Sequence, residues 1–321
     1  MSAGLFAVTT VGMPAPAYAE PNESGTEKLR KALDVATRAY LDAKYAMEKS
    51  QKENAALTTE LAQLEEAHTK KVAAVRELAA SAYTTGRLGA VSAMLGADSP
   101  DDFVDRIVMY GAVTANEDGT LREMVRSKER IEGKKAALAE TLDEQKKQLA
   151  IMTARKKQAE DALKEAGYGQ SGSGFGTLAK TAVPAPRNAD GSWPKESCSV
   201  DDPTTSGCIT PRTLHAYKQA RAAGFTRHVY CWRSGSSGEH PKGRACDFAA
   251  QTDGFGGAAT GGDRTYGNNL ATYFVKNADR LGVMYVIWYR QIWVNGSGWR
   301  SYSGSGSPGA EHTNHVHNSM Y

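Results

Sequence analysis

Two runs of apolar and small residues, spaced alternately by four and three positions, constrain the fold of this chain more than any other feature. The second run lies between Leu121 and Leu163 and has polar interruptions. The first run comprises Leu29, Leu33, Ala36, Tyr40, Ala43 and Met47, and then, after a break, Leu57, Leu61 and Leu64. Heptad spacing places such side chains along one seam of a helix. We therefore predict a long antiparallel coiled-coil hairpin over residues 24–167, although heptads also permit pairing between chains.

The stretch between the two runs, at about residues 86–112, predicts a short helical tip. Glycines interrupt the heptads here, and Asp98-Ser99-Pro100 offers an N-cap followed by proline at the first helical position. Apolar residues flank this cap: Leu88, Val91, Met94, Leu95, Phe103, Val104 and Ile107. They either pack into a small bundle that closes the hairpin or form a docking surface for a partner.

Composition separates this helical region from the rest of the chain. All four Cys and all five Trp of the 321 residues lie after residue 190. Residues 168–190 are rich in Gly, Ser, Ala and Pro, which is typical of a flexible linker. The remaining residues, 191–321, combine strand-like segments at 228–230 and 283–294 with helix-like segments. We predict an α+β fold for the whole chain, ending in a small α+β domain with a central antiparallel sheet.

Helix signals in this domain occur at two places. Pro211 to Ala223 reads as one helix, with Gly224 closing it, and Asn268 to Leu281 reads as another that ends at Gly282.

The N-terminus and the cysteines both predict export. Residues 1–19 resemble the remnant of a signal peptide, with a short apolar run and a small-x-small cleavage site at Ala17-Tyr18-Ala19. An even number of cysteines in one domain suits two disulfides in an oxidising compartment. Four cysteines allow three pairings, of which we favour Cys198–Cys208 with Cys231–Cys246. We expect a secreted or envelope-associated protein that is not itself transmembrane once the signal is removed.

The net charge of +3 is mild, and basic residues alternate with acidic ones along the helical region. A basic patch of the kind that binds nucleic acid is not visible in the sequence, so we expect no nucleic-acid partner.

Four polar residues near the C-terminus fit a metal-binding pattern. His240 and Asp247 are separated by six residues, and His315 and His317 alternate in a strand-like segment, so that both point to one face. Zinc accepts imidazole nitrogen and carboxylate oxygen, and a catalytic site keeps three protein ligands with an open fourth position. The sequence therefore predicts a site for one Zn²⁺. Gly243 is small where the chain between His240 and Asp247 must bend.

This pattern resembles that of the metallopeptidase clan grouped from lysostaphin, D-alanyl-D-alanine peptidases and the hedgehog domain. Their shared motif is His-x6-Asp followed by His-x-His, and Gly243 and Ala245 match the D-alanyl-D-alanine branch, whereas Gly238 stands where that branch has Ser. Trp232-Arg233-Ser234 is similar to the Tyr-Arg-Ser element of the same branch. The resemblance covers about residues 225–321 and implies a zinc-peptidase-like domain.

The resemblance also implies roles for individual residues. His240, Asp247 and His317 would bind zinc, and His315 would act as general base or orient the attacking water. Arg233 would stabilise an oxyanion or bind a substrate carboxylate.

Two further residues near His317 separate possible mechanisms. His312 matches the His-x-x-His-x-His arrangement of MepA-like murein endopeptidases, where it would line the substrate site. Members that use a catalytic Glu often place it three residues before the ligand His, but Asn314 occupies that position here. Glu311 is out of register, so we favour a histidine base and expect Glu311 to be a solvated surface acid.

The helical region has a resemblance of its own. Ala79 to Tyr83 with Gly86, Met94-Leu95, and Ser99 to Phe103 with Arg106 look like the coiled-coil segment of PcsB-like secreted murein hydrolases. In that family the coiled coil is a regulatory arm that engages the FtsEX division complex, which implies a membrane-protein partner at the tip.

Together these observations predict an exported, zinc-dependent hydrolase of peptidoglycan stem peptides, acting as a D,D-carboxypeptidase or endopeptidase and regulated by its arm. The alternative is a non-catalytic envelope scaffold or peptidoglycan-binding protein with a structural zinc site.

Overall fold

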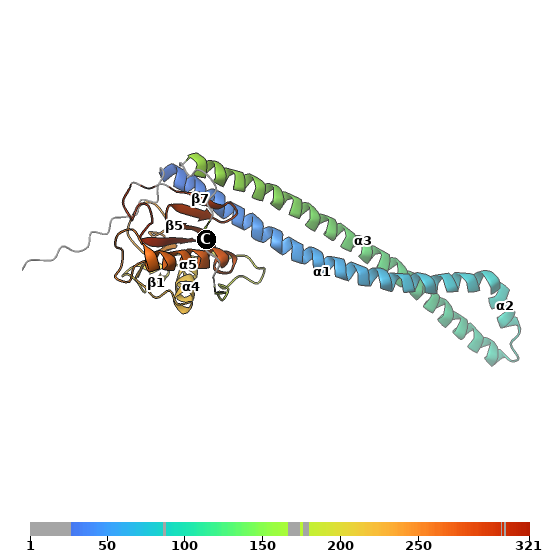
Figure 1. The fold of residues 1–321 in the computed structure, drawn as a ribbon. Helices are drawn as coiled ribbons and strands as arrows, with labels where there is room; N and C mark the ends of the chain where they lie inside the picture. Colours follow the sequence, from blue (N-terminus) through green and yellow to red (C-terminus); the bar gives the residue numbers. More distant parts are fainter. Residues whose placement is uncertain (1–26, 86–87, 166–173, 176–179, 303, 305) are drawn as a thin grey trace, which may run out of the picture. The chain divides into compact units, whose positions relative to one another are not determined.

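The computed structural model describes residues 27–85, 88–165, 174–175, 180–302, 304 and 306–321 (Figure 1). The predicted export signal, residues 1–19, lies outside this part, as does most of the first half of the predicted linker. The chain divides into two compact units. One joins the residues up to Ala43 with Ile151–Tyr321, and the other is Lys44–Ala150.

The described part of the N-terminal region contains three helices: α1 (Glu27–Thr85), α2 (Leu88–Leu95) and α3 (Pro100–Glu165). Within Lys44–Ala150, α1 and α3 lie side by side and run antiparallel. Ser50 Oγ donates to Thr141 O at 3.0 Å, whereas Lys71, further along α1, pairs with Glu123 at 2.8 Å, earlier in α3. The prediction of a long helical region is confirmed, and the coiled-coil character of the pair stays a prediction.

The start of α3 follows the predicted cap. Ser99 Oγ accepts a hydrogen bond from Asp102 N at 3.1 Å, and Pro100 is the first residue of the helix. Proline suits this position because its missing N–H would have no partner in the first turn.

Apolar side chains around this cap are solvent-exposed. Val91 is 49 % exposed, Leu95 80 %, Phe103 41 % and Val104 56 %. They do not form the small closing bundle that the sequence left open as one of two possibilities.

The C-terminal domain is built on an antiparallel sheet whose order is β3-β4-β8-β5-β6-β7. The strands are β3 (Val229–Tyr230), β4 (Ala245–Ala249), β8 (His315–Met320), β5 (Val283–Trp288), β6 (Gln291–Val294) and β7 (Gly298–Ser301). A separate two-stranded hairpin joins β1 (Val200–Asp201) and β2 (Cys208–Ile209). The predicted α+β class and central antiparallel sheet are confirmed.

One face of the large sheet packs against α5 (Gly261–Lys276). The rings of Phe248 on β4 and Phe274 on α5 lie 5.1 Å apart, and Val316 on β8 belongs to the same buried core. Side chains alternate between the faces of a strand. Asp247, His315 and His317 therefore lie on the face away from α5.

Both predicted helices of the domain exist, but one prediction was wrong in detail. α4 (Pro211–Ala222) begins where expected, with the Thr210 side chain accepting from Thr213 N. The second helix begins at Gly261, not Asn268, and is interrupted at Asn277 before α6 (Ala278–Leu281). The Gly261-Gly262 pair reads as a loop locally, yet burial of the helix face that contains Leu270 and Phe274 outweighs that propensity. Gly282 ends α6 with φ +78°, as predicted.

Both favoured disulfides are present, Cys198–Cys208 and Cys231–Cys246. None of the helices in the described part of the chain combines the length and apolar character needed to cross a bilayer.

Candidate metal centre

Three side chains that could bind a metal converge from two strands and a loop. Asp247 on β4 is paired with His317 on β8 in the antiparallel register, so their side chains lie next to each other on the same face. His240 comes from the loop before β4. One potential ligand atom from each lies within 4.8 Å of the others, and all three residues are buried.

The distances between these atoms fit a metal ion. His240 Nε2 lies 3.2 Å from His317 Nδ1 and 3.3 Å from Asp247 Oδ1, and His317 Nδ1 lies 2.8 Å from the same oxygen. Ligands at ~2.1 Å from a tetrahedral zinc ion are ~3.4 Å apart. The donor set, two imidazoles and one carboxylate, is also one that zinc accepts. The residues present therefore fit the predicted zinc ion with small adjustments.

Hydrogen bonds orient both imidazoles toward this point. His240 Nδ1 donates to Cys231 O, which leaves the Nε2 lone pair facing Asp247 and His317. His317 Nε2 lies 2.7 Å from Ser319 Oγ. Because a hydroxyl can donate or accept, Ser319 supports either His317 tautomer, including the one that frees Nδ1 for a metal.

His315 lies beside the three candidate ligands, as predicted. Its Nδ1 donates to Asn314 Oδ1 at 2.7 Å, and its Nε2 lies 3.6 Å from Asp247 Oδ1. Within the described part of the chain this Nε2 is buried and has no hydrogen-bond partner. The ring therefore presents an acceptor lone pair to the site, the arrangement that a general base needs.

His312 reaches the same cluster from the loop before β8. Its ring centroid lies 4.6 Å from that of His315 and 5.7 Å from that of His317. It is completely buried, so the predicted role of lining a substrate site would need the neighbouring groups to move.

The electrostatics of the cluster keep Asp247 charged and favour the neutral forms of His312 and His315. Burial raises the pKa of Asp247, but His240, His315 and Arg233 outweigh it and hold the pKa well below its usual range. Burial lowers the pKa of His315 to about 4, against an opposing effect of Asp247. Burial, with help from His315 and His317, also holds the pKa of His312 well below its usual range.

Arg233 contacts the ligand set directly. Its Nη1 donates to Asp247 Oδ2 at 2.7 Å, and the side chains are 17 % and 4 % exposed. Asp247 Oδ1 faces the histidines while Oδ2 is held by the guanidinium. Arg233 thus fixes the carboxylate in addition to any contact that its other donors make with a substrate.

The structure explains why the loop between His240 and Asp247 has a small residue at Gly243. Its φ is +68°, and a Cβ there would lie 2.6 Å from Cys198 Sγ and 2.7 Å from Ile209 Cα. Only glycine combines this backbone conformation with this close approach. The predicted reason for the glycine is confirmed.

Glu311 is not the solvated acid that the sequence predicted. Its side chain is 17 % exposed, and its Oε2 accepts from Arg290 Nη2 at 2.6 Å and from Arg290 Nε at 2.9 Å. The two residues also meet through the backbone, where Arg290 N donates to Glu311 O. The partner lies on a β-turn distant in sequence, which local spacing could not reveal.

Two buried carboxylates near the site were not predicted from the sequence. Glu239, next to His240, is 3 % exposed at its side chain and pairs with Arg244 and Lys242 at 2.7 Å each. Asp202 is also buried and contacts the segment that contains Cys231. Glu239 could have been suspected from its position next to a ligand, whereas nothing near Asp202 in the sequence points to the site.

Comparison with known proteins gives a family-model match. A family model described as "VldE, C-terminal domain" matches residues 205–313, a range that includes His240 and Asp247 but ends before His315 and His317. No curated protein and no solved structure matches the chain.

Proposed function

We propose that this protein is an exported, zinc-dependent peptidoglycan hydrolase that cleaves an amide bond of the stem peptide, as a D,D-carboxypeptidase or endopeptidase. One observation carries the proposal. A buried two-histidine, one-carboxylate ligand set lies next to a fourth side chain, His315, whose inward nitrogen has a free lone pair. A purely structural zinc site is usually closed by four protein ligands and has no use for such a base.

His240, Asp247 and His317 would hold the zinc ion. When bound, zinc supplies Lewis acidity that polarises an amide carbonyl and lowers the pKa of water to about 7. The chain's own residues then provide orientation and proton transfer.

His315 is suited to take the proton from the attacking water. Its neutral ring has Nδ1 fixed by Asn314, so that Nε2 is the basic atom, and Asp247 at 3.6 Å favours the imidazolium that forms. The same Nε2 would later give the proton to the leaving amine. Arg233 would stabilise negative charge on the carbonyl oxygen with the donors that Asp247 does not use.

Export is supported by the two disulfides of the domain, because such bonds persist in oxidising compartments. The stem peptide as substrate, and a membrane complex of the FtsEX kind as partner of the helical tip, rest on the sequence resemblances. The exposed apolar side chains at Leu95 and Val104 agree with a docking surface there.

Regulation by the arm has a physical basis within the compact unit that contains both the domain and α1 up to Ala43. Arg38 Nη2 of α1 donates to Glu239 Oε2 at 3.0 Å and to Met320 O at 3.2 Å. Glu239 precedes the ligand His240, and Met320 ends the strand that holds His317. A change at this end of α1 would therefore reach both ligand-bearing segments. The burial of all three ligands also requires a movement before a peptide can enter.

The direct test is to incubate the full chain with purified muropeptides and follow new fragments by mass spectrometry. We expect zinc-dependent cleavage that a chelator abolishes, and its loss in His315→Gln with zinc still bound. Loss of zinc from His315→Gln would show that this residue is a ligand instead. Zinc binding without any product, under conditions that also include a candidate activator, would favour the non-catalytic scaffold.

Regulation has its own test. Arg38→Ala should raise the rate of cleavage because it removes the contact that joins α1 to Glu239, whereas Lys31→Ala, an exposed cation on the same helix, should leave it unchanged. Equal rates for wild type and Arg38→Ala would argue against inhibition through this contact.

A further inference from the structure

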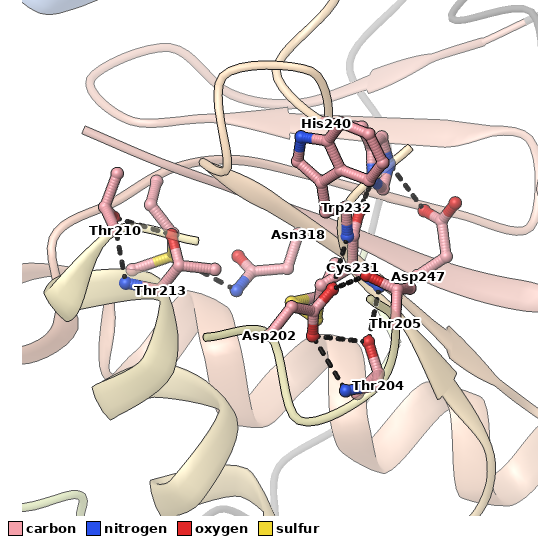
Figure 2. Close-up of a disulfide and its surroundings, with 12 residues drawn as sticks. Asp202, Thr204, Thr205, Thr210, Thr213, Cys231, Trp232, His240, Asp247 and Asn318 are labelled. Atoms are coloured by element: carbon pink, nitrogen blue, oxygen red, sulfur yellow. Dashed lines mark hydrogen bonds and ion pairs between the residues drawn. A yellow bond between two sulfur atoms is a disulfide. The ribbon is translucent and has the colours of Figure 1, made fainter. Parts of the chain in front are cut away.

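The hairpin formed by β1 and β2 ends in a loop organised by one buried carboxylate, Asp202 (Figure 2). Its two oxygens accept four hydrogen bonds. Oδ1 accepts from Thr204 N at 2.8 Å and Thr204 Oγ1 at 2.7 Å, and Oδ2 accepts from Thr205 Oγ1 at 2.6 Å and Trp232 N at 2.7 Å. Two of these donor residues belong to the same loop, and the third, Trp232, lies 30 residues further along the chain. All of the donors are uncharged.

The same loop holds two consecutive backbone amides of another segment. Trp232 N donates to Asp202, and Cys231 N donates to Thr204 Oγ1 at 2.9 Å. Gly207, at the end of the loop, packs so closely on the Trp232 ring that a Cβ there would lie 2.2 Å from it. The Cys198–Cys208 disulfide closes the base of the hairpin. The loop therefore holds residues 231–232 in place through hydrogen bonds and packing.

Residues 231–233 make three direct connections to the candidate metal centre. Cys231 O accepts the hydrogen bond from His240 Nδ1, which sets the tautomer that turns Nε2 to the metal. The Cys231–Cys246 disulfide joins the segment to the residue before Asp247. Arg233, the next residue, holds Asp247 Oδ2. A shift of this segment would displace two of the three ligands.

We propose that Asp202 is a positioning residue of the metal centre, which acts through the backbone of residues 231–232 to fix the orientation of His240 and Arg233. The inference deepens the proposed function, because it concerns the same site. Partners of this kind set the tautomer and direction of a ligating imidazole, and their loss typically weakens metal binding 10–100-fold. Asp202 would set the orientation of His240 through the intervening backbone, without contacting any of the three candidate ligands.

The test compares Asp202→Asn with Asp201→Asn in the full chain. Both replace a carboxylate by an amide at adjacent positions, but Asp201 is exposed and Asp202 is buried. The amide nitrogen cannot accept a hydrogen bond, so Asp202→Asn loses part of its contacts at nearly unchanged volume. Thr204→Val, which removes only the hydroxyl that bridges Asp202 and Cys231 N, is a second variant should Asp202→Asn fail to fold.

Three measurements report on the position of His240 without requiring catalysis. Competition with a chelator gives the Zn²⁺ affinity, and the absorption spectrum of the Co²⁺ form reports the ligand geometry. Nitrogen NMR of the metal-free chain reports which His240 nitrogen carries the proton. We expect Asp202→Asn to bind Zn²⁺ about 10–100-fold more weakly, with an altered Co²⁺ spectrum and a loss of the pure Nδ1–H form. Asp201→Asn should match wild type in all three.

The proposal is overturned if Asp202→Asn and Thr204→Val keep the wild-type Zn²⁺ affinity, Co²⁺ spectrum and His240 tautomer while only the unfolding temperature falls. Asp202 would then stabilise the hairpin alone. Failure of the proposed function is a different result: wild type would bind Zn²⁺ but cleave no stem peptide, and the effect of Asp202→Asn on binding would remain. If wild type binds no metal, the tautomer measurement alone decides.

Discussion

The helical region and the C-terminal domain both contain ion pairs, but in opposite environments. In the unit Lys44–Ala150 the pairs lie on helix surfaces, as in Lys70–Glu66, whose side chains are 76 % and 72 % exposed. In the domain, the side chains of Arg233 and Asp247 are 17 % and 4 % exposed. An exposed pair adds little to stability, whereas removing one partner of a buried pair leaves a charge without compensation. The same kind of substitution should therefore change the free energy of unfolding much more in the domain than in the helical region.

The two regions also differ in the sequence distance that their contacts span. Lys70 and Glu66 are four residues apart on one helix, whereas Asp247 and His317 are separated by 70. Local contacts re-form in any helix, but the candidate metal centre forms only when the sheet is assembled. The comparison predicts that the domain, and not the helical region, carries the metal-dependent stability of the chain.

The largest effect is expected from Asp247→Ala. It removes the carboxylate that lies against three histidines and Arg233, and a broken buried pair typically costs about 3–5 kcal/mol. Urea unfolding with a chelator present should show this loss, and calorimetry should show no Zn²⁺ binding. Wild-type affinity for Zn²⁺ in this variant would contradict the assignment of Asp247 as a ligand.

Removal of the Cys231–Cys246 disulfide should have the next largest effect. The cysteines are 15 residues apart, and closing a loop of about this length stabilises a fold by about 3 kcal/mol. The double variant Cys231→Ser with Cys246→Ser should lose this stability in chemical unfolding, and should also bind Zn²⁺ more weakly because the segment before Arg233 is freed.

The matched control for that variant is Cys198→Ser with Cys208→Ser, whose separation is 10 residues. It should lose slightly less stability, since a shorter loop restricts the unfolded chain less. Wild-type Zn²⁺ affinity in Cys231→Ser with Cys246→Ser would mean that the disulfide next to Asp247 has no role at the site.

Lowering the pH should destabilise the metal-free chain through its buried histidines. The pKa of His315 is lowered to about 4 and that of His312 is lowered well below its ordinary value of 6.5, both chiefly by burial. Between pH 6.5 and 4 the unfolded chain takes up protons at these positions and the folded chain does not. The free energy of unfolding should therefore decrease as the pH is lowered. The slope should approach about 1.4 kcal/mol per pH unit for each such histidine.

Unfolding of His312→Gln over the same pH range checks this assignment. The variant should show a shallower decline between pH 6.5 and 4, because one buried neutral histidine is gone. A slope equal to that of wild type would mean that His312 takes up its proton in the folded chain.

Much of the fold follows from local sequence patterns, and the exceptions have physical causes. Heptads predicted α1 and α3, and the Ser99-Pro100 cap predicted where α3 begins, because these signals act within one or two helical turns. The start of α5 was misjudged because its Gly-Gly opening is a poor helix former. Its helical state depends on packing against the sheet, which no local pattern reports.

The candidate site likewise contains residues that local sequence patterns predicted and residues that they did not. His-x6-Asp and His-x-His, with their donor chemistry and the resemblance they carry, predicted residues that converge. The register that places Asp247 opposite His317 joins two strands far apart in sequence, so spacing alone did not predict it. Asp202 and the Arg290 partner of Glu311 were not predictable, because each contact joins loops that are unrelated in sequence. Spacing identifies groups that share a strand or loop, whereas the residues that hold them depend on the assembled fold.

The smallest effect is expected from Glu66→Gln in the helical region. The substitution removes a charge from an i, i+4 pair with Lys70 at 2.8 Å, just as a change at Asp247 removes one from its pair with Arg233. Both Glu66 and Lys70 remain in water, however, so the unpaired lysine keeps its hydration and the helix keeps its backbone hydrogen bonds. The unfolding temperature and the Zn²⁺ affinity should equal those of wild type, at low and at high salt. A clear loss of stability would mean that Glu66 is covered in solution, by a second chain or by another segment. The contrast between an exposed helical region and a buried candidate metal centre would then be wrong.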